Sequence, residues 1–257
     1  MVSTGPLTLI PIHAAGSGHG ICHVCQLVDS SYVTTLESLL RAQKKNVSIP
    51  KENQNFLFVS QPETPGHTVL PQTTEEVNEV VQILCESGWP EENIVCLSGA
   101  EATVDTVSVA LGSHSWVHLA CHGAQDSELG MKSAFALHDG YLGLCEIASK
   151  RLINSRFALL STCQAASGQK DLPGEAIHLA AGLQLAGFPS VIATLWKIRD
   201  DDAQKVAVHM YRFLLRNGLE GLDPSDATSA LNHAILCLRE DPSVTVDRWA
   251  PFIHFGI

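Results

Sequence analysis

The sequence lacks several features that would assign a chain of this size to a common class. Its 257 residues contain no apolar run approaching the roughly 18 residues that a membrane span requires. The amino end has no basic stretch followed by an apolar one, so no secretory signal is expected. Lys and Arg number 16 against 27 Asp and Glu, and the net charge of −11 argues against a general nucleic-acid binder. We therefore expect a cytoplasmic protein with neither a membrane nor a nucleic-acid partner.

Internal repeats, low-complexity linkers and a phosphate-binding loop are also missing. The stretch Gly16-Ser-Gly-His-Gly20 has no Gly-Lys-Ser/Thr and no strand-to-helix context. The 8 cysteines are even in number, but an even count indicates disulfides only in a small secreted chain. Half of them lie in apolar periodic segments, where a reduced cysteine packs as a small apolar side chain. We expect reduced cysteines and one domain, 1–257, with a loop-rich segment at 1–30.

Short apolar segments alternate with helical patterns along the chain. The segments typical of strands buried on both faces are 56–60, 94–97, 116–121, 157–161 and 190–195, with 133–137 as a further candidate. Helical patterns follow Thr73, Asp200 and Pro224 and also cover 174–187. This alternation predicts an α/β fold, a three-layer sandwich with a mainly parallel sheet and helices on both faces.

Two of these helices carry recognisable start signals. Thr73 and Glu76 have the spacing of a capping box. Three aspartates at 200–202 suit the positive end of a helix dipole. The segment 174–187 is nearly all apolar, and we expect this helix to be buried in the middle of the domain.

A histidine and a cysteine each follow one of the apolar segments. His122 ends Trp116-Val-His-Leu-Ala-Cys-His122, and Cys163 ends Phe157-Ala-Leu-Leu-Ser-Thr-Cys163. Residues just beyond the carboxyl ends of parallel strands line a common crevice, so these two side chains are expected to meet there. A thiolate beside an imidazolium is a nucleophile, and backbone N–H groups of Gly123 and Cys163 would suit an oxyanion. The residues alone also fit a core cysteine and an ordinary His-Gly turn.

Two other groups of residues have metal-ligand types. His114, His118 and His122 are four apart and would share one face of a helix, as in a zinc hydrolase. The segment Trp116 to Cys121 has the pattern of a strand, in which these histidines would not cluster. Cys22 and Cys25 form half of a zinc motif, but a second half with similar spacing is missing. An ordinary loop explains them equally well.

The acidic run at 200–202 has a second interpretation besides helix capping. It follows the segment 190–195 and therefore falls on the crevice side of the predicted sheet. A carboxylate there would hold a cationic substrate side chain. Both interpretations stay open from the residues alone.

The ordered set of motifs resembles the CHAT domain, a caspase-like cysteine peptidase domain often found after tetratricopeptide repeats. The resemblance rests on these segments: Leu9-Ile-Pro-Ile-His-Ala-Ala15, Trp116-Val-His-Leu-Ala-Cys-His-Gly123 with Asp126, Leu137-His-Asp-Gly140, Leu160-Ser-Thr-Cys-Gln164 with Gly174-Glu-Ala-Ile-His-Leu-Ala-Ala-Gly182, Ala186-Gly-Phe-Pro-Ser-Val-Ile-Ala-Thr-Leu-Trp196 with Asp200, and Trp249-Ala-Pro-Phe-Ile-His-Phe-Gly256. They span almost the whole chain, and their order is far more specific than any single motif.

The resemblance implies roles for individual residues. Cys163 would be the nucleophile, His122 its proton donor and acceptor, and Gly123 part of the oxyanion hole. The stretch from Leu195 to Asp200 is also similar to separase, in which an acidic residue of this region accepts an arginine side chain. Asp200 is therefore expected in a specificity pocket that favours a basic residue before the scissile bond. Asp139 and Glu175 are weaker candidates for the same pocket.

The expected activity is cleavage of protein or peptide substrates, in regulated cell death or defence signalling, by chemistry that requires no cofactor or metal. Family members usually carry further sequence and repeats upstream, so we expect an excised domain or a chain truncated at the amino end, with a separate upstream sensor. Two rival hypotheses remain. One is a catalytically inactive, caspase-like interaction domain, and the other is the zinc hydrolase.

Overall fold

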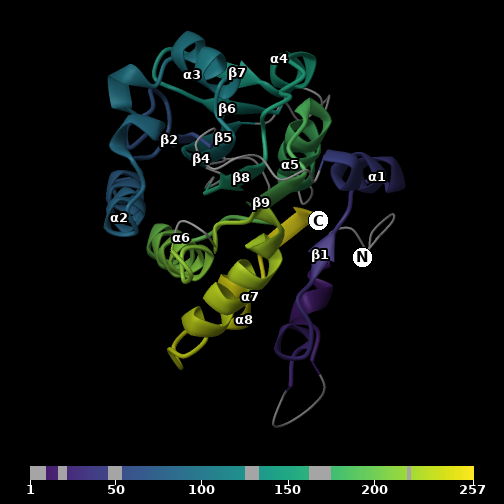
Figure 1. The fold of residues 1–257 in the computed structure, drawn as a ribbon. Helices are drawn as coiled ribbons and strands as arrows, with labels where there is room; N and C mark the ends of the chain where they lie inside the picture. Colours follow the sequence, from purple (N-terminus) through teal and green to yellow (C-terminus); the bar gives the residue numbers. More distant parts are fainter. Residues whose placement is uncertain (1–9, 17–21, 46–53, 125–132, 162–174, 219–220) are drawn as a thin grey trace.

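The fold is built around a seven-stranded sheet that is covered by helices on both faces (Figure 1). The computed structural model describes residues 10–16, 22–45, 54–124, 133–161, 175–218 and 221–257. The strands of the main sheet are β1 (Ser31–Tyr32), β2 (Phe56–Ser60), β3 (Ile94–Ser98), β4 (Trp116–Ala120), β8 (Phe157–Leu160), β9 (Ser190–Thr194) and β10 (Phe252–Gly256). The helices are α1 (Leu36–Lys45), α2 (Gln72–Glu86), α3 (Val104–Leu111), α4 (Leu144–Ser149), α5 (Glu175–Ala186), α6 (Asp200–Leu214), α7 (Ala227–Leu238) and α8 (Val246–Trp249). This arrangement confirms the predicted α/β sandwich.

The strand order is β1-β10-β9-β8-β4-β2-β3, and the five strands from β9 to the edge strand β3 run parallel. From β2 the chain passes to β3 on one side and then to β4 on the other. Beyond β4 it continues outward through β8 and β9. Such a reversal of direction leaves a crevice at the carboxyl ends of the strands, where ligands bind in open α/β sheets. The carboxyl ends of β2, β4 and β8 therefore lie at one edge of the sheet.

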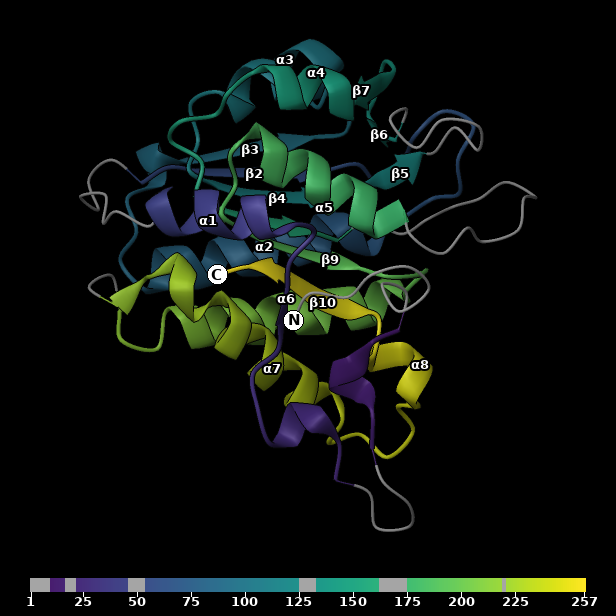
Figure 2. The same ribbon diagram turned by 90° about the vertical axis from the view of Figure 1, so that its right-hand side faces the viewer.

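Alternate residues of each strand face opposite helical layers. Phe56 and Phe58 pack with α2, α6 and α7, whereas Leu57 and Val59 pack with α3, α4 and α5. In the rotated view, α3, α4 and α5 lie on one side of the sheet and α6 and α7 on the other (Figure 2). Because both faces are covered, the central strands are mostly apolar, as the sequence indicated.

A second, smaller sheet leaves the main one directly after β4. It consists of β5 (His122–Ala124), β6 (Ala134–Ala136) and β7 (Tyr141–Gly143), paired antiparallel in the order β5-β6-β7. The predicted segment 133–137 does contain a strand, β6, but this strand belongs to the small sheet and not to the main sheet. The strand β6 is short, and the polar turn 138–140 follows it, so it does not form a full strand of the main sheet.

The structure corrects three further details of the sequence analysis. The strand 94–97 is at the sheet edge, and its side chains are half-exposed because only β2 lies beside it. The helix 174–187 covers one face of the sheet instead of lying inside it, and Leu185 is exposed. The closing segment holds an unexpected strand, β10, which runs antiparallel to β9.

The loop-rich segment 1–30 is irregular where it is described. It contains two single-turn 3₁₀ helices, Ile12–Ala14 and Val24–Gln26. The described cysteines, which are all except Cys163, form no disulfide with one another. Among the helices in the described ranges, none combines the length and the apolar composition needed to cross a membrane.

Candidate active site

The carboxyl ends of β2, β4 and β8 bring three segments together at one edge of the main sheet. The register pairs Ser60 with Ala120, and Leu119 with Leu160. The backbone N–H of Ser161 donates to the carbonyl oxygen of Leu119 at 3.0 Å, which extends this register beyond β8. His122 therefore lies two residues past the end of β4, beside the end of β8. Cys163 lies outside the described residues.

His122 is fully buried, and its hydrogen bonding defines the state of its ring. Nε2 is 2.6 Å from the carbonyl oxygen of Thr68, which belongs to the loop after β2. A carbonyl oxygen only accepts, so Nε2 must carry the hydrogen and donate it. In the neutral imidazole the other nitrogen, Nδ1, then bears the lone pair. Thr68 thus makes Nδ1 the atom of His122 that can take a proton.

A second histidine packs directly against His122. The ring of His67 stacks on the ring of His122 with centroids 4.8 Å apart and an interplanar angle of 22°. Nε2 of His67 also lies 3.1 Å from the hydroxyl of Tyr141 on β7. Burial, and then the nearby charge of His122, lower the pKa of His67 below its usual value. His67 therefore favours its neutral form and supports the His122 ring by packing.

A buried polar network lies beneath this edge of the sheet. Nε2 of His118 on β4 is 2.8 Å from a carboxylate oxygen of Glu76 on α2 and 3.3 Å from the hydroxyl of Ser161. The Ser161 hydroxyl donates to the same carboxylate oxygen. All three side chains are buried, so these bonds replace the water that the carboxylate lost. The network fixes Ser161, the last described residue before Cys163.

The aromatic ring of Tyr211 completes the surroundings of His118. It stacks on His118 with centroids 6.0 Å apart, and Phe58 approaches the same ring edge-on. Burial, followed by the charge of Glu76, raises the pKa of the Tyr211 phenol, which keeps it neutral. The carboxylate of Glu76 is thus held in a largely apolar layer by two hydrogen-bond donors.

This network overturns the capping-box interpretation of Glu76. Helix α2 begins at Gln72 without a side-chain cap, and the Thr73 hydroxyl instead donates to the carbonyl oxygen of Leu70. Glu76 turns inward because it is four residues before Val80 and seven before Ile83, which are both core positions. The spacing of Glu76 from Val80 and Ile83 could have predicted that its side chain points into the core. The capping-box spacing from Thr73 to Glu76 favoured a different role for Glu76 in the sequence analysis.

The three histidines of the zinc hypothesis are not brought together. His118 bonds to Glu76, Nδ1 of His114 lies 2.7 Å from the carbonyl oxygen of Ala110, and His122 bonds to Thr68. In the ranges that the structure describes, residues suited to a metal ion group elsewhere, on α6 and α7. The strand geometry predicted for Trp116–Cys121 explains this separation, because residues four apart along a strand are about 13 Å from one another, too far to bind one metal ion.

The other predicted site residues lie in separate helices, strands and turns. Asp200 is the first residue of α6, follows β9 at the carboxyl edge of the sheet and is half-buried. Glu175 is the first residue of α5, and its side chain is outside the described part. Asp139 is exposed in the turn between β6 and β7, where its Oδ1 accepts a 2.8 Å hydrogen bond from the N–H of Val104 at the start of α3. Gly123 is in β5 and pairs with Phe135.

The two aspartates next to Asp200 already have arginine partners. Asp202 is fully buried and accepts hydrogen bonds from Nε and Nη2 of Arg248 on α8, at 2.8 and 2.5 Å. Asp201 pairs with Arg199 at 2.9 Å. These pairs anchor the first turn of α6, which carries Asp200 at the crevice side of the sheet.

Solved structures share this architecture. The Arg specific cysteine proteinase gingipain R (RGPB) superposes with a TM-score of 0.62 and 13% identity over 88% of this chain and 52% of its own. The complex of Porphyromonas gingivalis RgpB pro- and mature domains gives a TM-score of 0.61 and 13% identity over 88% of this chain and 54% of that chain. The Saccharomyces cerevisiae separase–securin complex gives a TM-score of 0.61 and 13% identity over 97% of this chain and 14% of that chain. These likenesses place the chain in the caspase-like fold class.

The family follows from the sequence profile. The profile of the CHAT domain matches residues 1–257, and the chain belongs to that family. None of the curated protein sequences compared with the chain matches it. The chain spans about half the length of the gingipain chains and a much smaller share of the separase chain.

Proposed function

We propose that the chain is a cysteine endopeptidase in which Cys163 is the nucleophile and His122 its proton acceptor and donor. The observation that carries the proposal is the hydrogen bond from Nε2 of His122 to the carbonyl of Thr68. It leaves Nδ1 as the basic nitrogen of a buried ring at the carboxyl edge of a parallel sheet. A histidine oriented by a backbone carbonyl is the partner that a thiol nucleophile requires.

Covalent reach supports the same pairing. Ser161 is fixed beside the end of β4 by its bonds to Leu119 and Glu76. Cys163 is two residues further along, so its Cα lies within roughly 7 Å of the Ser161 Cα. His122 is likewise two residues past the end of the neighbouring strand. These short covalent spans from neighbouring strand ends support the proposed pairing of Cys163 with His122.

The proposed reaction has two halves. The Cys163 thiolate attacks the peptide carbonyl, and the backbone N–H groups of Gly123 and Cys163 stabilise the oxyanion. When the carbon–nitrogen bond breaks, His122 donates its proton to the leaving amine, and a thioester remains on Cys163. His122 then accepts a proton from water, which attacks the thioester and releases the carboxylic acid and the thiolate.

We further propose that the acyl-side pocket accepts a basic side chain at Asp200. The position of this carboxylate at the carboxyl end of β9 supports it, as does the net charge of −11. One of the similar structures is an Arg specific cysteine proteinase. Asp139, whose carboxylate accepts the N–H of Val104, and Glu175 stay weaker candidates from the sequence resemblance.

The biological role we propose is regulated proteolysis of a dedicated protein substrate, in cell death or defence, under an upstream sensor. Two similar structures are complexes, one of pro- and mature domains and one of separase with securin. In each complex a further polypeptide accompanies the protein that is similar to this chain. They are compatible with control by a partner, which for this chain is a proposal.

The test is hydrolysis of fluorogenic peptides that vary at the residue before the cleaved bond. We expect turnover by the wild type and loss of at least about a hundredfold in Cys163→Ala, because the nucleophile is removed. The matched control is Cys145→Ala, which removes an exposed cysteine on α4 and should leave turnover unchanged.

The rival hypothesis of an inactive interaction domain makes the opposite prediction. It expects no turnover of any peptide, and equal reactivity of Cys163 and Cys145 towards thiol reagents. Residual hydrolysis that survives Cys163→Ala would contradict both hypotheses, because it would require a different catalytic group.

A further inference from the structure

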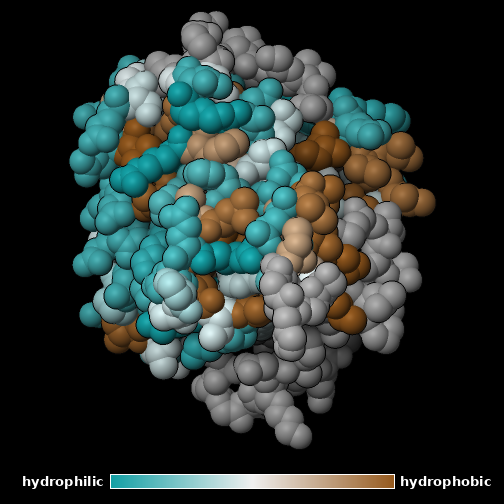
Figure 3. All heavy atoms as spheres, turned by 90° about the horizontal axis from the view of Figure 1, so that it is seen from below, coloured by the Kyte–Doolittle hydropathy of each residue, from teal (hydrophilic) through white to brown (hydrophobic). Residues whose placement is uncertain are grey.

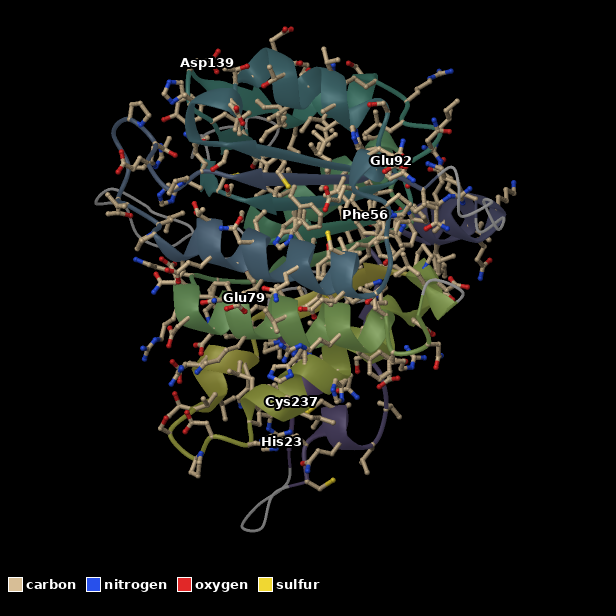
Figure 4. All side chains as sticks on the ribbon, turned by 60° about the vertical axis from the view of Figure 1, so that its left-hand side comes forward. His23, Phe56, Glu79, Glu92, Asp139 and Cys237 are labelled. Carbon is tan, nitrogen blue, oxygen red and sulfur yellow. The ribbon has the colours of Figure 1, made fainter. Side chains whose placement is uncertain are left out.

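Three potential metal ligands converge between α6 and α7, on the opposite side of the sheet from the small three-stranded sheet. They are His209 on α6 and His233 and Cys237 on α7, and one ligand atom from each lies within 4.8 Å of the others. Figure 4 labels Cys237 on α7, which lies next to α6 in that view. The two residues on α7 are one helical turn apart and therefore share a face.

The distance between Cys237 and His233 matches one edge of a tetrahedral metal site. Sγ of Cys237 is 3.5 Å from Nε2 of His233. With Zn–S about 2.3 Å and Zn–N about 2.05 Å, the edge of a tetrahedron between these two ligands is about 3.5 Å. His209 faces them from the neighbouring helix, and its ligand atom lies within 4.8 Å of the other two.

We propose that His209, His233 and Cys237 bind a zinc ion that links α6 to α7. Two imidazoles and one thiolate are a ligand set that zinc favours, and three protein ligands leave a fourth position for water or a carboxylate. The charge of Glu240 affects the pKa of both His209 and Cys237, so its carboxylate is a candidate for this fourth position. This site is independent of the proposed peptidase activity.

The surroundings of the three ligands suit an ion that arrives from solvent. His233 is exposed, and the other two ligands are half-buried. The face seen from below in Figure 3 carries hydrophilic areas interspersed with hydrophobic patches. The ring of Phe213 packs against His233 with centroids 5.1 Å apart, which restricts the orientation of that imidazole. A restricted ligand loses less conformational freedom when it binds a metal.

Local charges set the state of the ligands before binding. Burial, and then the Glu240 carboxylate, raise the pKa of the Cys237 thiol, so zinc must displace its proton. Burial lowers the pKa of His209, followed by the charges of Arg212 and His233, which keeps the imidazole neutral and able to bind. The simple alternative is a thiol–imidazole hydrogen bond between Cys237 and His233 without any ion.

The test uses the full chain carrying Cys163→Ala under reducing conditions, so that the proposed nucleophile cannot bind metal. Native mass spectrometry should detect one zinc per chain. Cobalt(II) added instead of zinc should produce the visible bands of a tetrahedral ion and a thiolate-to-cobalt charge-transfer band. We expect Cys237→Ser to abolish the charge-transfer band and His209→Gln to weaken zinc binding at least about tenfold.

The matched controls are Cys145→Ser and His138→Gln, an exposed cysteine and an exposed histidine away from α6 and α7, and both should bind zinc as the parent does. Circular dichroism of each metal-free variant checks that it folds. Absence of stoichiometric zinc, or a cobalt spectrum unchanged by Cys237→Ser, overturns the proposal. Loss in Cys237→Ser with full affinity in His209→Gln also overturns it, because the ion would then not bridge the helices.

Discussion

The ring of His122 donates a 2.6 Å hydrogen bond to the backbone of Thr68, so the loop after β2 orients a side chain that follows β4. Such a contact is insensitive to the Thr68 side chain because only its carbonyl takes part. It orients the imidazole before any substrate arrives, and an oriented base is worth more in catalysis than a mobile one. The predictions below start from this arrangement.

Replacing His122 should abolish most of the proposed activity. His122→Gln keeps a donor of similar reach but has no basic nitrogen, so general acid–base catalysis is lost. We expect kcat/KM to fall by about 10² to 10⁴. The exposed His138 offers the control substitution His138→Gln, and equal activity in the two variants would refute the assignment of His122.

The network of Glu76, His118 and Ser161 should influence both stability and turnover. Glu76→Gln removes the carboxylate that accepts two hydrogen bonds beneath the sheet edge. We expect a loss of about 1.5 to 3 kcal/mol in the free energy of unfolding, measured with urea. Because Ser161 leads into the segment with Cys163, kcat should fall more than KM changes.

The control for Glu76 lies on the same helix. Glu79 is exposed on α2 and accepts a hydrogen bond from Gln204 on α6; Figure 4 labels Glu79 between these two helices. Glu79→Gln should change the free energy of unfolding by less than about 0.5 kcal/mol and leave kcat unaltered. If the two variants behave alike, Glu76 has no role in positioning the loop after β8.

The Asp200 pocket predicts a selective change in substrate preference. Asp200→Ala should lower kcat/KM for peptides with Arg or Lys before the cleaved bond by about thirtyfold, equivalent to about 2 kcal/mol. Peptides with an uncharged residue there should be cleaved as before. Asp201→Ala, which removes the adjacent aspartate paired with Arg199, is the control. An unchanged substrate preference in Asp200→Ala would contradict the assignment of Asp200 to the pocket.

Two buried histidines predict lower stability in mild acid. Burial lowers the pKa of His254 from 6.5 to about 3 and that of His13 to about 4. Between these values and 6.5 the unfolded chain binds more protons than the folded one. Their contribution is therefore complete above pH 6.5 and decreases as the pH falls towards 4, by at most about 1.4 kcal/mol per pH unit for each group.

Urea titrations at pH 7.5 and 5.5 measure this effect. His254 bonds to Ser190 and Thr228, so the substitution His254→Gln retains a polar side chain while removing the titrating group. We expect the difference in unfolding free energy between the two pH values to shrink by about half in this variant. His138→Gln should leave the difference as it is in the wild type, and a full difference in His254→Gln would contradict the prediction.

The sequence predicted those parts of the fold that depend on local pattern. The central strands were recognisable because both of their faces are buried, which makes segments such as Phe157–Leu160 wholly apolar. Strand β10 was not predicted, because its buried His254 interrupts the apolar run and its partner β9 is distant in sequence. The edge position of β3 depends on the order of the strands, which periodicity does not encode.

Of the candidate site, the sequence offered only part. Motif order selected His122 as a candidate, but His67 and Thr68, which contact it, belong to a loop whose proximity depends on the strand register. Their position just beyond β2 was a usable signal, because the loops after parallel strands meet at one edge. The pairing of His209 with Cys237 was not predictable, because it depends on the packing of two helices.

Covalent labelling tests the central claim most directly. Intact-protein and peptide mass spectrometry after treatment with a peptidyl chloromethyl ketone, carrying Arg next to the reactive carbon, locates any adduct. The proposed dyad predicts one adduct per chain, on Cys163, with a rate that falls at least about a hundredfold in His122→Gln. Labelling of Cys163 that is no faster than labelling of the exposed Cys145, or that is indifferent to His122→Gln, would contradict the proposed dyad.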